Sequence, residues 1–523
     1  MHIGVDVGGT NTDAVIMDGR RLLATCKTPT TEDVSTGVII GIREVLMQAS
    51  IGADDIAATM IGTTQFTNAF VERKRLTAVG VIRISLPSCV DVRPMLDWPQ
   101  DLTNVVGDHV YWSHGGYQFD GTEISPFSAD DVRKAARDMR RKGLRRIAVS
   151  CTFSPVNSSM EIQAAEIIRA EMPDARITLS SEIGRLGMVE RENAAIMNAA
   201  LSDLSQLVVR AFTNALASLR IQSPLYLTQN DGTLMAADYV ERFPVLTFAS
   251  GPTNSIRGAA FLSGLDHAIV VDIGGTTTDV GVLVNRFPRE SSVAVDIGGV
   301  RTNFRMPDIL SIGLGGGSYV RRAAGKVSIG PDSVGYALTS KGLVFGGDVL
   351  TTTDIAVADR GLKIGDSSRV EGLDKSVIDG AVSEIHRMTE EAIDRMKTAA
   401  GGAEVVLVGG GGILISGDVK GVSKLHVPQH ASVANAIGAA MAQVGGETDR
   451  VFSYEKAGRD TAIQQAKAEA SEKATKAGAI PSTVSIVDVE ELPMAYLPSG
   501  AVRVRVKAVG DLDLTPQAKG RQG

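Results

Sequence analysis

Val270-Val271-Asp272-Ile273-Gly274-Gly275-Thr276-Thr277-Thr278-Asp279 is the stretch that decides the fold. It predicts an apolar strand carrying one aspartate, a tight Gly-Gly turn followed by hydroxyl side chains, and a second strand over residues 280–283. The same phrase opens the chain as Ile3-Gly4-Val5-Asp6-Val7-Gly8-Gly9-Thr10-Asn11-Thr12-Asp13. The offset between the copies is a constant 266 residues, as from Asp6 to Asp272. The chain therefore repeats one strand–turn–strand unit.

The repeated unit has the composition of a phosphate-binding turn. A Gly-Gly turn alone is weak evidence, because many hairpins use glycine only for its positive φ. Here a strand carboxylate, two glycines and several hydroxyls occur together twice. Glycine lets N–H groups approach a phosphate, threonine adds donors, and an aspartate can hold Mg²⁺ directly or through water. Two ordinary hairpins are the alternative. Two phosphate turns that face each other would hold a polyphosphate from both sides.

This paired pattern resembles the superfamily of actin, the sugar kinases and Hsp70. The resemblance implies an α/β fold of duplicated actin-like (ribonuclease H-like) ATPase domains, with a nucleotide cleft between them. The other common phosphate-binding motif, G-x-x-x-x-G-K-[ST], does not occur in the sequence, which disfavours a P-loop protein.

A third glycine-rich phrase is Val405-Val406-Leu407-Val408-Gly409-Gly410-Gly411-Gly412. Its apolar run predicts a buried parallel strand, and the glycines allow a flat ring to lie against the backbone. In the superfamily this is the position of the adenosine-binding turn. Small residues from Ser250 to Ala260 and from Ala434 to Ala440 predict two closely packed helices, which in the superfamily form the hinge between the domains.

The overall composition excludes several classes of protein. A chain of 523 residues with 44% hydrophobic residues and a mean hydropathy of +0.08 predicts a globular protein of more than one domain. The net charge of −7 without a long basic run argues against nucleic acid as a partner. No apolar stretch of about 18 residues and no leader pattern is present, so we expect no membrane contact. Three scattered cysteines are typical of a reducing, cytoplasmic location.

We expect three parts along the chain. Residues 1–186 would form the N-terminal actin-like domain, with a helix over 34–49. Residues 187–446 would form the second domain, beginning with a long helix over about 188–219 and carrying a glycine-rich insertion at about 286–370. Residues 447–523 would form a small C-terminal α+β module that ends in a disordered tail from Thr515.

Three other features leave alternatives open. The hydroxyl and amide side chains of residues 61–70 either face the cleft or cap a helix through Thr63 or Thr64. The glycine segment 312–318 is either an anion-binding nest or a tight loop. His109 and His114 lie in a polar segment, 87–125, that predicts a surface excursion; they are either metal ligands or exposed to solvent.

Within the superfamily the chain resembles the hydantoinase/oxoprolinase group, in particular the ATP-binding subunit called hydantoinase A, over nearly its whole length. The matching stretches are Gly4–Ala14, Gly62-Thr63-Thr64 with Thr67-Asn68-Ala69, Asn230-Asp231-Gly232, Ser250-Gly251-Pro252, Asp272–Val280, and Gly315-Gly316-Gly317-Ser318 with Gly330-Pro331. The stretches Asn157–Glu161 and Tyr336–Thr339 depart from the family pattern, because the first lacks its histidine and the second its cysteine.

The resemblance and the residue chemistry together assign roles. Asp6 and Asp272 are the candidate catalytic residues and the candidate Mg²⁺ ligands. Asp13 and Asp279 either brace the turns or assist the metal. The candidate ATP-binding residues are Gly8, Gly9, Thr10, Asn11, Gly274, Gly275, Thr276 and Thr277 for the phosphates, and Gly409, Gly410, Gly411 and Gly412 for adenosine.

The resemblance implies an ATP-dependent hydrolase subunit that opens a small cyclic amide such as a hydantoin, oxoproline or a related lactam. Phosphorylation of the amide oxygen makes an electrophile that water attacks, and phosphoryl transfer depends on positioning and charge neutralisation. The family often places the hydrolytic half in a second hydantoinase-type subunit, so we expect a heteromer, a homo-oligomer or both. The alternatives are an ATP-using subunit of a ketone carboxylase and an ATP-driven reactivating or chaperone-like factor.

Overall fold

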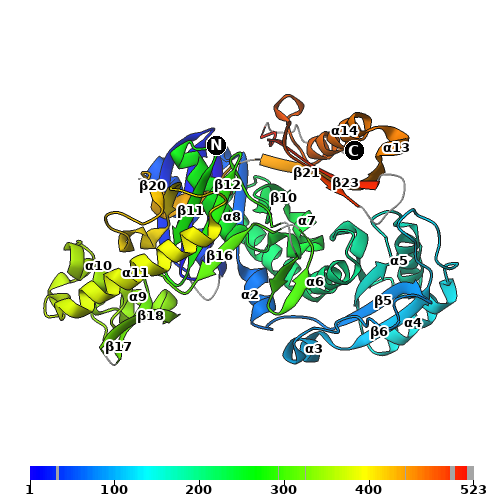
Figure 1. Ribbon diagram of the computed structural model, residues 1–523, viewed down its shortest axis with the longest axis horizontal. Coiled ribbons are helices and arrows are strands. Elements are labelled where there is room, and N and C mark those ends of the chain that lie inside the picture. The colour runs from blue at the N-terminus through cyan, green and yellow to red at the C-terminus, as the bar shows by residue number, and fades with distance from the viewer. Residues whose placement is uncertain are drawn as a thin grey trace.

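The computed structural model describes residues 1–30, 34–291, 294–304, 306–323, 325–441, 443–494 and 501–514. The predicted tail from Thr515 lies outside these residues. In Figure 1 the second repeat and the helices and strands between residues 318 and 426 lie in the left part of the molecule, together with the N-terminal strands drawn in blue. The helices and strands between residues 65 and 220 form the lower right part, and the C-terminal segment lies above them.

The first repeat, strands β1 and β2, lies next to the edge strand β3 of a nine-stranded sheet. The strand order is β22-β23-β21-β10-β9-β4-β1-β2-β3. The bounds are β1 His2–Val7, β2 Asn11–Asp18, β3 Arg21–Pro29, β4 Ala58–Thr63, β9 Leu225–Thr228, β10 Leu234–Ala236, β21 Gln443–Ser453, β22 Ser485–Pro493 and β23 Ala501–Asp511. Strand β1 pairs antiparallel with β2, so that Asp6 lies opposite Asp13, and parallel with β4.

The second repeat forms an equivalent sheet with the same register. Its order is β13-β12-β11-β19-β20, and β16 also pairs with β12. The bounds are β11 Ala268–Ile273, β12 Thr278–Val284, β13 Phe287–Pro288, β16 Ile309–Ile312, β19 Ala403–Val408 and β20 Val422–His426. Asp272 lies opposite Asp279, as Asp6 lies opposite Asp13, and β19 is parallel to β11 as β4 is to β1. The fold is therefore a duplicated actin-like one, as the sequence predicts.

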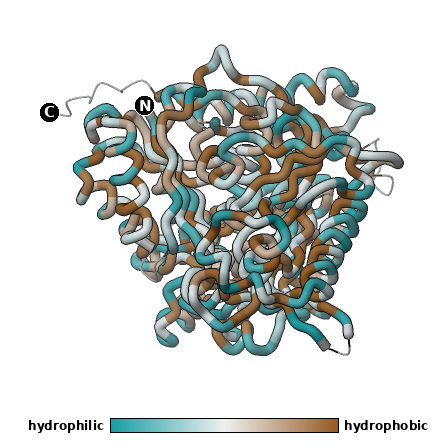
Figure 2. The backbone as a smooth tube through the Cα atoms, turned by 90° about the vertical axis from the view of Figure 1, so that its left-hand side faces the viewer, coloured by the Kyte–Doolittle hydropathy of each residue, from teal (hydrophilic) through white to brown (hydrophobic). Residues whose placement is uncertain are grey.

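Burial on both faces explains the unbroken apolar runs of the central strands. On β11, Ile269, Val271 and Ile273 belong to one core cluster. Ala268 and Val270, which alternate with them, belong to a second cluster on the opposite face. Helix α11 (Lys375–Met396) contributes to the first cluster and α8 (Ser250–Ser263) to the second. Figure 2 shows hydrophobic stretches, in brown, running through the middle of the molecule.

The segment 65–220 forms a separate layer beside the first sheet. Its four-stranded parallel sheet has the order β6-β5-β7-β8. The bounds are α2 Gln65–Val71, β5 Val79–Leu86, α3 Gln100–Val106, β6 His109–His114, α4 Ala129–Arg141, β7 Arg146–Cys151, α5 Ser159–Glu171, β8 Arg176–Leu179 and α6 Met188–Ser218. The predicted surface excursion at 87–125 is wrong, because it contains α3 and a strand that pairs with β5.

The remaining helices and hairpins match the predictions only in part. The predicted helix over 34–49 is confirmed as α1 (Val34–Ala49), and the one over 188–219 as α6. The insertion is more regular than expected, with the elements β14 Val295–Ile297, β15 Val300–Thr302, β17 Ser318–Ala323, β18 Lys326–Ser333, α9 Leu338–Lys341 and α10 Thr352–Arg360. None of the helices that the structure describes is both long enough and apolar enough to cross a membrane.

The C-terminal segment is hydrogen-bonded into the first sheet. Strand β21 begins before the expected boundary at 446/447 and pairs parallel with β10, where Val444 lies opposite Leu234. After the short helix α13 (Tyr454–Ala457), α14 (Arg459–Lys476) packs on β21 and β23. The buried stripe of α14 consists of Ala462, Ala466, Ala470 and Ala474. The division of the chain into three domains stays a prediction.

Two crossing helices join the halves of the molecule. Helix α8 packs against α12 (Ala434–Ala439), and each contributes one glycine to the contact. A Cβ added at Gly258 would lie 1.8 Å from the Ala434 carbonyl oxygen. A Cβ added at Gly438 would lie 1.8 Å from the Asn254 carbonyl oxygen. Only glycine permits this backbone-to-backbone approach, so the predicted close packing of these two segments is confirmed.

We predict that Gly258→Ala destabilises the protein by at least about 2 kcal/mol, since overpacking a rigid contact costs that order of free energy. Urea unfolding followed by circular dichroism measures it. Gly372→Ala is the matched control, because a Cβ at Gly372 meets nothing within 4 Å. Equal unfolding midpoints for the two variants would contradict the close contact of α8 and α12.

Candidate nucleotide site

The two glycine turns have the same internal hydrogen bond. In the first glycine turn (Gly8–Asn11) the Gly8 N–H donates to the Asn11 carbonyl at 3.0 Å. In the second glycine turn (Gly274–Thr277) the Gly274 N–H donates to the Thr277 carbonyl at 2.9 Å. The N–H groups of Gly9, Thr10, Gly275 and Thr276 have no partner among the described residues. These N–H groups are therefore available to an anion.

The carbonyl groups of the first turn are bound from behind. The Thr30 hydroxyl donates to the Gly8 carbonyl at 2.8 Å, and the Thr30 N–H donates to the Thr10 carbonyl at 2.9 Å. The turn is thereby fixed through its acceptors, while its donors stay free.

The glycine segment 312–318 supports the second turn in the same way. The N–H groups of Gly316 and Gly317 donate to the carbonyls of Gly274 and Gly275 at 3.0 and 2.7 Å. The Gly315 N–H donates to the Ser318 hydroxyl. All three N–H groups are used within the protein, so this segment is a tight supporting loop and not an anion nest.

The two turns meet at the junction of the halves. A Cβ added at Gly275 would lie 2.8 Å from Thr10 Oγ1. The free N–H groups of both turns and the Thr10 hydroxyl are thus gathered at one place, as a polyphosphate bound from both sides requires.

Two aspartates lie behind these turns, one at the end of each central strand. Asp6 is buried and Asp272 is partly buried. Burial raises the pKa of both carboxyl groups, and the charge of Asp272 raises the pKa of Asp6 further. Lys27 partly offsets this effect on both. Two adjacent carboxylates with raised pKa values have too little positive charge around them, which fits a bound divalent cation.

The residues present therefore fit Mg²⁺. The described residues contain no group of three or more His, Cys, Asp or Glu side chains that would hold a metal on its own. Mg²⁺ in phosphate-transfer sites needs only one or two carboxylates, because phosphate oxygens and water complete its ligands. Asp6 and Asp272 supply two carboxylates next to the turns.

The partners of the two carboxylates come from the crossing helices, and sequence reasoning missed them. The Asn254 and Asn435 amides donate to the two oxygens of Asp6 at 3.0 and 3.2 Å. The Ser255 hydroxyl donates to Asp272. The available signal was the presence of polar residues in two segments otherwise made of small residues.

Asp13 and Asp279 occupy bracing positions. Asp13 forms an ion pair with Lys27 at 2.6 Å, its cross-strand neighbour on β3. Asp279 accepts a hydrogen bond from Ser311, its neighbour on β16. Burial raises the pKa of each aspartate to about 6.

The third glycine phrase lies against the second turn. Gly409 follows β19 with a φ of +86°, and a Cβ there would lie 2.2 Å from Asp272 Oδ1. A Cβ on Gly411 would lie 2.5 Å from Ile273 Cγ2. At Gly410 a Cβ would meet nothing within 4 Å. Gly412 completes the turn, whose open side at Gly410 leaves room for a flat group beside the phosphate turns.

The structure also places the polar residues 63–70 and the two histidines, His109 and His114. Thr64 precedes α2 without a side-chain capping bond, whereas the Thr63 hydroxyl accepts a hydrogen bond from the Gln65 N–H at 3.3 Å.

Neither histidine is in a loop, since both belong to β6. His114 Nδ1 is 2.8 Å from Asp131, and the described residues place no third ligand there.

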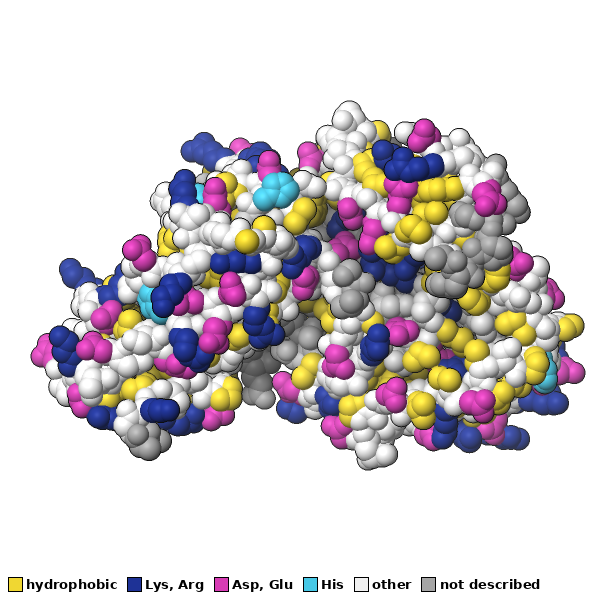
Figure 3. Space-filling view, in the orientation of Figure 1, with side chains coloured by type: hydrophobic (Ala, Val, Ile, Leu, Met, Phe, Trp, Pro, Cys, Tyr) yellow, Lys and Arg dark blue, Asp and Glu magenta, His cyan; other side chains and the backbone are white. Residues whose placement is uncertain are grey.

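A separate cavity of about 850 Å³ lies between the segment 181–186, the β9–β10 region and the C-terminal strand β21. It is lined by charged residues, including Arg185, Asp231 and Asp449, but by none of the predicted site residues. Figure 3 shows acidic and basic side chains in the hollow below the C-terminal segment.

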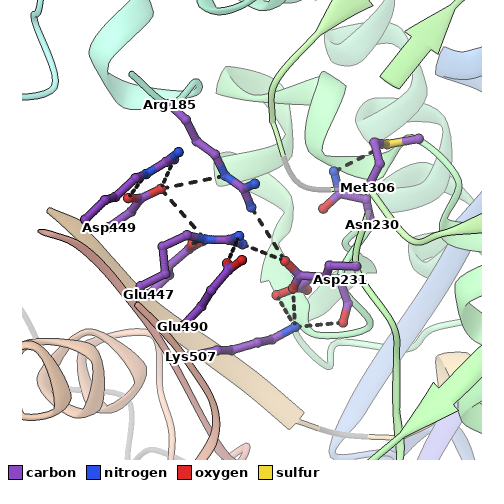
Figure 4. A network of polar contacts seen from close by, with 11 residues as sticks. Arg185, Asn230, Asp231, Met306, Glu447, Asp449, Glu490 and Lys507 are labelled. Atoms are coloured by element: carbon purple, nitrogen blue, oxygen red, sulfur yellow. Dashed lines mark hydrogen bonds and ion pairs between the residues drawn. The ribbon is translucent and has the colours of Figure 1, made fainter. Parts of the chain in front are cut away.

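An ion-pair network beside this cavity ties the C-terminal strands to both halves. Lys507 contacts Asp231 at 3.0 Å and Glu290 at 3.4 Å. Arg505 contacts Glu290 at 3.0 Å, and Arg185 is 3.7 Å from Asp449 (Figure 4). These charges neutralise one another, so the network fits a structural joint.

The architecture and the paired turns define an actin-like ATPase fold, and solved structures agree. The chain aligns with ATP-dependent caprolactamase from Pseudomonas jessenii at a TM-score of 0.75 and 19% identity, over 97% of this chain and 87% of that one. It aligns with the nucleotide-free structure of acetone carboxylase at a TM-score of 0.68 and 18% identity, over 98% and 88%.

The chain belongs to the hydantoinase/oxoprolinase family. The model of the hydantoinase/oxoprolinase N-terminal region matches residues 2–172, and the hydantoinase/oxoprolinase model matches residues 191–358. Together the two matches cover more than half of the chain. The resemblance inferred from the glycine phrases is therefore confirmed.

Two relatives that carry an enzyme name are subunits of enzymes with different reactions. The chain is 26% identical to the acetophenone carboxylase gamma subunit of Aromatoleum aromaticum, over 68% of this chain and 52% of the relative. It is 25% identical to the caprolactamase subunit alpha of Pseudomonas jessenii, over 64% and 51%. The chain thus spans about half the length of these two relatives.

We predict that Asp279→Asn stabilises the nucleotide-free protein at pH 8 by about 1 to 3 kcal/mol. The pKa of Asp279 is about 6 in the folded state against an ordinary 3.8. Between these two pKa values the folded state keeps a proton on Asp279 that the unfolded state has lost. The free energy of unfolding therefore falls as the pH rises through this range, and the loss is complete above about pH 6. The amide of the variant does not titrate, so the variant avoids this loss.

Urea unfolding at pH 3.5, 5 and 8 measures the effect, and the variant should show no advantage at pH 3.5. Asp460→Asn is the control, because this side chain is 95% exposed. A difference from wild type that is equal at all three pH values would refute the raised pKa.

Proposed function

We propose that this chain is the ATP-binding subunit of an enzyme that phosphorylates and opens a small cyclic amide. The observation that carries the proposal is the meeting of the two glycine turns, where Gly275 lies against Thr10 in front of the carboxylates of Asp6 and Asp272. Free N–H groups from both turns would bind the β- and γ-phosphates of ATP. The turn Gly409–Gly412 would accept adenosine.

The reaction would proceed in three steps. The amide oxygen attacks the γ-phosphorus of ATP, the bond from that phosphorus to the β-phosphate oxygen breaks, and ADP leaves. Water then adds to the activated carbon, and the ring C–N bond breaks with a proton passing to nitrogen, which leaves an acyl phosphate. A second water attacks the acyl phosphate and releases phosphate and the carboxylate. Mg²⁺ bound near Asp6 and Asp272 would supply neutralisation of the phosphate charge.

The chain's own groups supply the remaining contributions. The N–H groups of Gly9, Thr10, Gly275 and Thr276 would stabilise charge on the transferring phosphoryl group, because they are fixed before the reaction begins. The bracing through Thr30 and Gly316 keeps both turns from relaxing. Positioning of this kind is the main contribution a protein makes to phosphoryl transfer.

We propose that a second subunit completes the enzyme. The support is the naming of several relatives as subunits, including the acetophenone carboxylase gamma subunit and the caprolactamase subunit alpha. The hydrolytic step and the choice of cyclic amide would then depend on the partner.

A ketone carboxylase subunit is the second candidate. It is favoured by the acetophenone carboxylase gamma subunit and by the acetone carboxylase beta subunit of Xanthobacter autotrophicus, which is 22% identical over 64% of this chain. The same nucleotide site would serve this reaction, in which ATP activates a ketone and bicarbonate.

We predict that Asp272→Asn lowers ATP turnover by at least about 100-fold, since loss of one transition-state contact in such sites costs that order. Phosphate release measures turnover. Asp266→Asn is the matched control, because this residue precedes the same strand and its side chain is 67% exposed. Full turnover by the Asp272 variant, with an unchanged circular dichroism spectrum, would show that the nucleotide site does not include Asp272.

We predict that the purified chain binds ATP but opens no lactam until its partner is added. The measurement is product analysis with hydantoins, oxoproline and simple lactams, in the presence and absence of co-purified proteins. Bicarbonate-dependent carboxylation of a ketone would instead establish the second candidate. Lactam opening by the pure chain would contradict the need for a partner.

A further inference from the structure

Two consecutive residues of one helix hold the two carboxylates of the site. On α8, the Asn254 amide donates to Asp6 Oδ1 at 3.0 Å. The next residue, Ser255, donates its hydroxyl hydrogen bond to Asp272 Oδ2. Asp6 belongs to the first sheet and Asp272 to the second. One turn of α8 therefore sets the relative place of two groups that come from different halves of the protein.

The two carboxylates are held unequally. Asn435 of α12 donates to Asp6 Oδ2 at 3.2 Å, so both oxygens of Asp6 accept a hydrogen bond from an amide. Asp272 accepts from Ser255 through Oδ2, and its Oδ1 has no donor among the described residues. Oδ1 lies beside Gly409, where an added Cβ would be 2.2 Å from it.

The two amides hold the Asp6 carboxyl group from both sides, one on each oxygen. Asn254 is fully buried, and its own Oδ1 has no partner among the described residues. A buried amide with an unpaired oxygen is unfavourable for stability. The residue is therefore better explained by what it does to Asp6 than by what it adds to the core.

The helix that carries these donors is rigidly placed. Gly258 lies one turn after Asn254, in contact with Ala434, and Gly438 lies against the Asn254 backbone. Helix α8 also contacts strands of both sheets, including β1 and β11. Because neither crossing helix can shift along the other without a backbone clash, the donors cannot drift from the carboxylates. Such fixed placement is what phosphoryl transfer requires.

We propose that Asn254, Ser255 and Asn435 are positioning residues that give the two aspartates different tasks. They hold both oxygens of Asp6 in amide hydrogen bonds, and they leave one oxygen of Asp272 free for the divalent cation that accompanies ATP. This inference rests on the proposed function. It assigns direct contact with the cation to Asp272, and to Asp6 a fixed position behind it.

The decisive variants are Ser255→Ala, which removes one donor with almost no change in volume, and Asn254→Ala, which removes the other donor together with its carboxamide group. Both should lower kcat for ATP turnover about 10- to 100-fold, the loss expected for a hydrogen bond to a charged group. KM for ATP should stay within about threefold, because the glycine turns are untouched. Ser263→Ala is the control, since Ser263 lies on the same helix and bonds only to backbone, including the Ala259 carbonyl.

A binding measurement tests the cation assignment without turnover. Calorimetry with ATP in Mg²⁺ and with ATP in EDTA gives the gain in affinity due to the cation. Ser255→Ala should reduce that gain, and Asp272→Asn should abolish it. Asn435→Ala should preserve at least half of the gain, because it acts on Asp6 only.

Asn254→Asp separates positioning from packing. It has nearly the shape of asparagine but places a negative charge against Asp6. A packing role predicts that it is milder than Asn254→Ala, whereas the positioning role predicts that it is more severe in kcat.

The outcomes distinguish this inference from the proposed function. If Ser255→Ala and Asn254→Ala keep normal kcat and a normal Mg²⁺ effect while Asp272→Asn loses both, the inference is wrong and the nucleotide site stands. If Asp272→Asn is also normal, the proposed function itself fails. Since Ser255→Ala deletes one oxygen atom, it decides the matter even if the Asn254 variants fold poorly.

Discussion

The structure depends on holding two carboxylates close together inside a protein junction. Asp6 and Asp272 end the central strands of two sheets, and burial raises the pKa of both. A protein tolerates such a pair only if donors and a cation offset the charge. The crossing of α8 and α12 supplies the donors, and the glycine contacts of that crossing fix them. The free N–H groups of the two turns then lie where an anion with its own cation would complete the balance.

The duplicated fold could be predicted because the repeated phrase carries its own physical reasons. A buried strand needs an apolar run, the turn needs glycine, and the parallel strand β19 needs an unbroken apolar run for its two covered faces. The prediction that the two turns face each other followed from the same repeat. The support of the second turn by Gly316 and Gly317 could not be derived, because a glycine segment is compatible with a nest or a loop until its N–H groups are placed. The donors Asn254 and Asn435 were missed because a polar residue in a small-residue helix has no periodic signal.

The C-terminal segment shows the limits of composition more plainly. Its alanine-rich helix and alternating strands predicted an appendix, and the helix and strands are present. However, β21 pairs with β10 through a single register position, which no local pattern encodes. The charged side chains of Lys507 and Arg505 then join the segment to Glu290 of the insertion. A similar long-range pairing, β6 with β5, turned a polar segment that was expected to be a surface excursion into part of a parallel sheet.

We propose that both glycine turns contact one triphosphate. The most direct measurement is a crystal structure of the chain with Mg²⁺ and a non-hydrolysable ATP analogue. We predict phosphate oxygens within hydrogen-bonding distance of N–H groups from both turns, with the adenine beside Gly410 and the cation nearest to Asp272. A nucleotide that contacts only one turn, or that lies in the cavity beside Arg185, would contradict it.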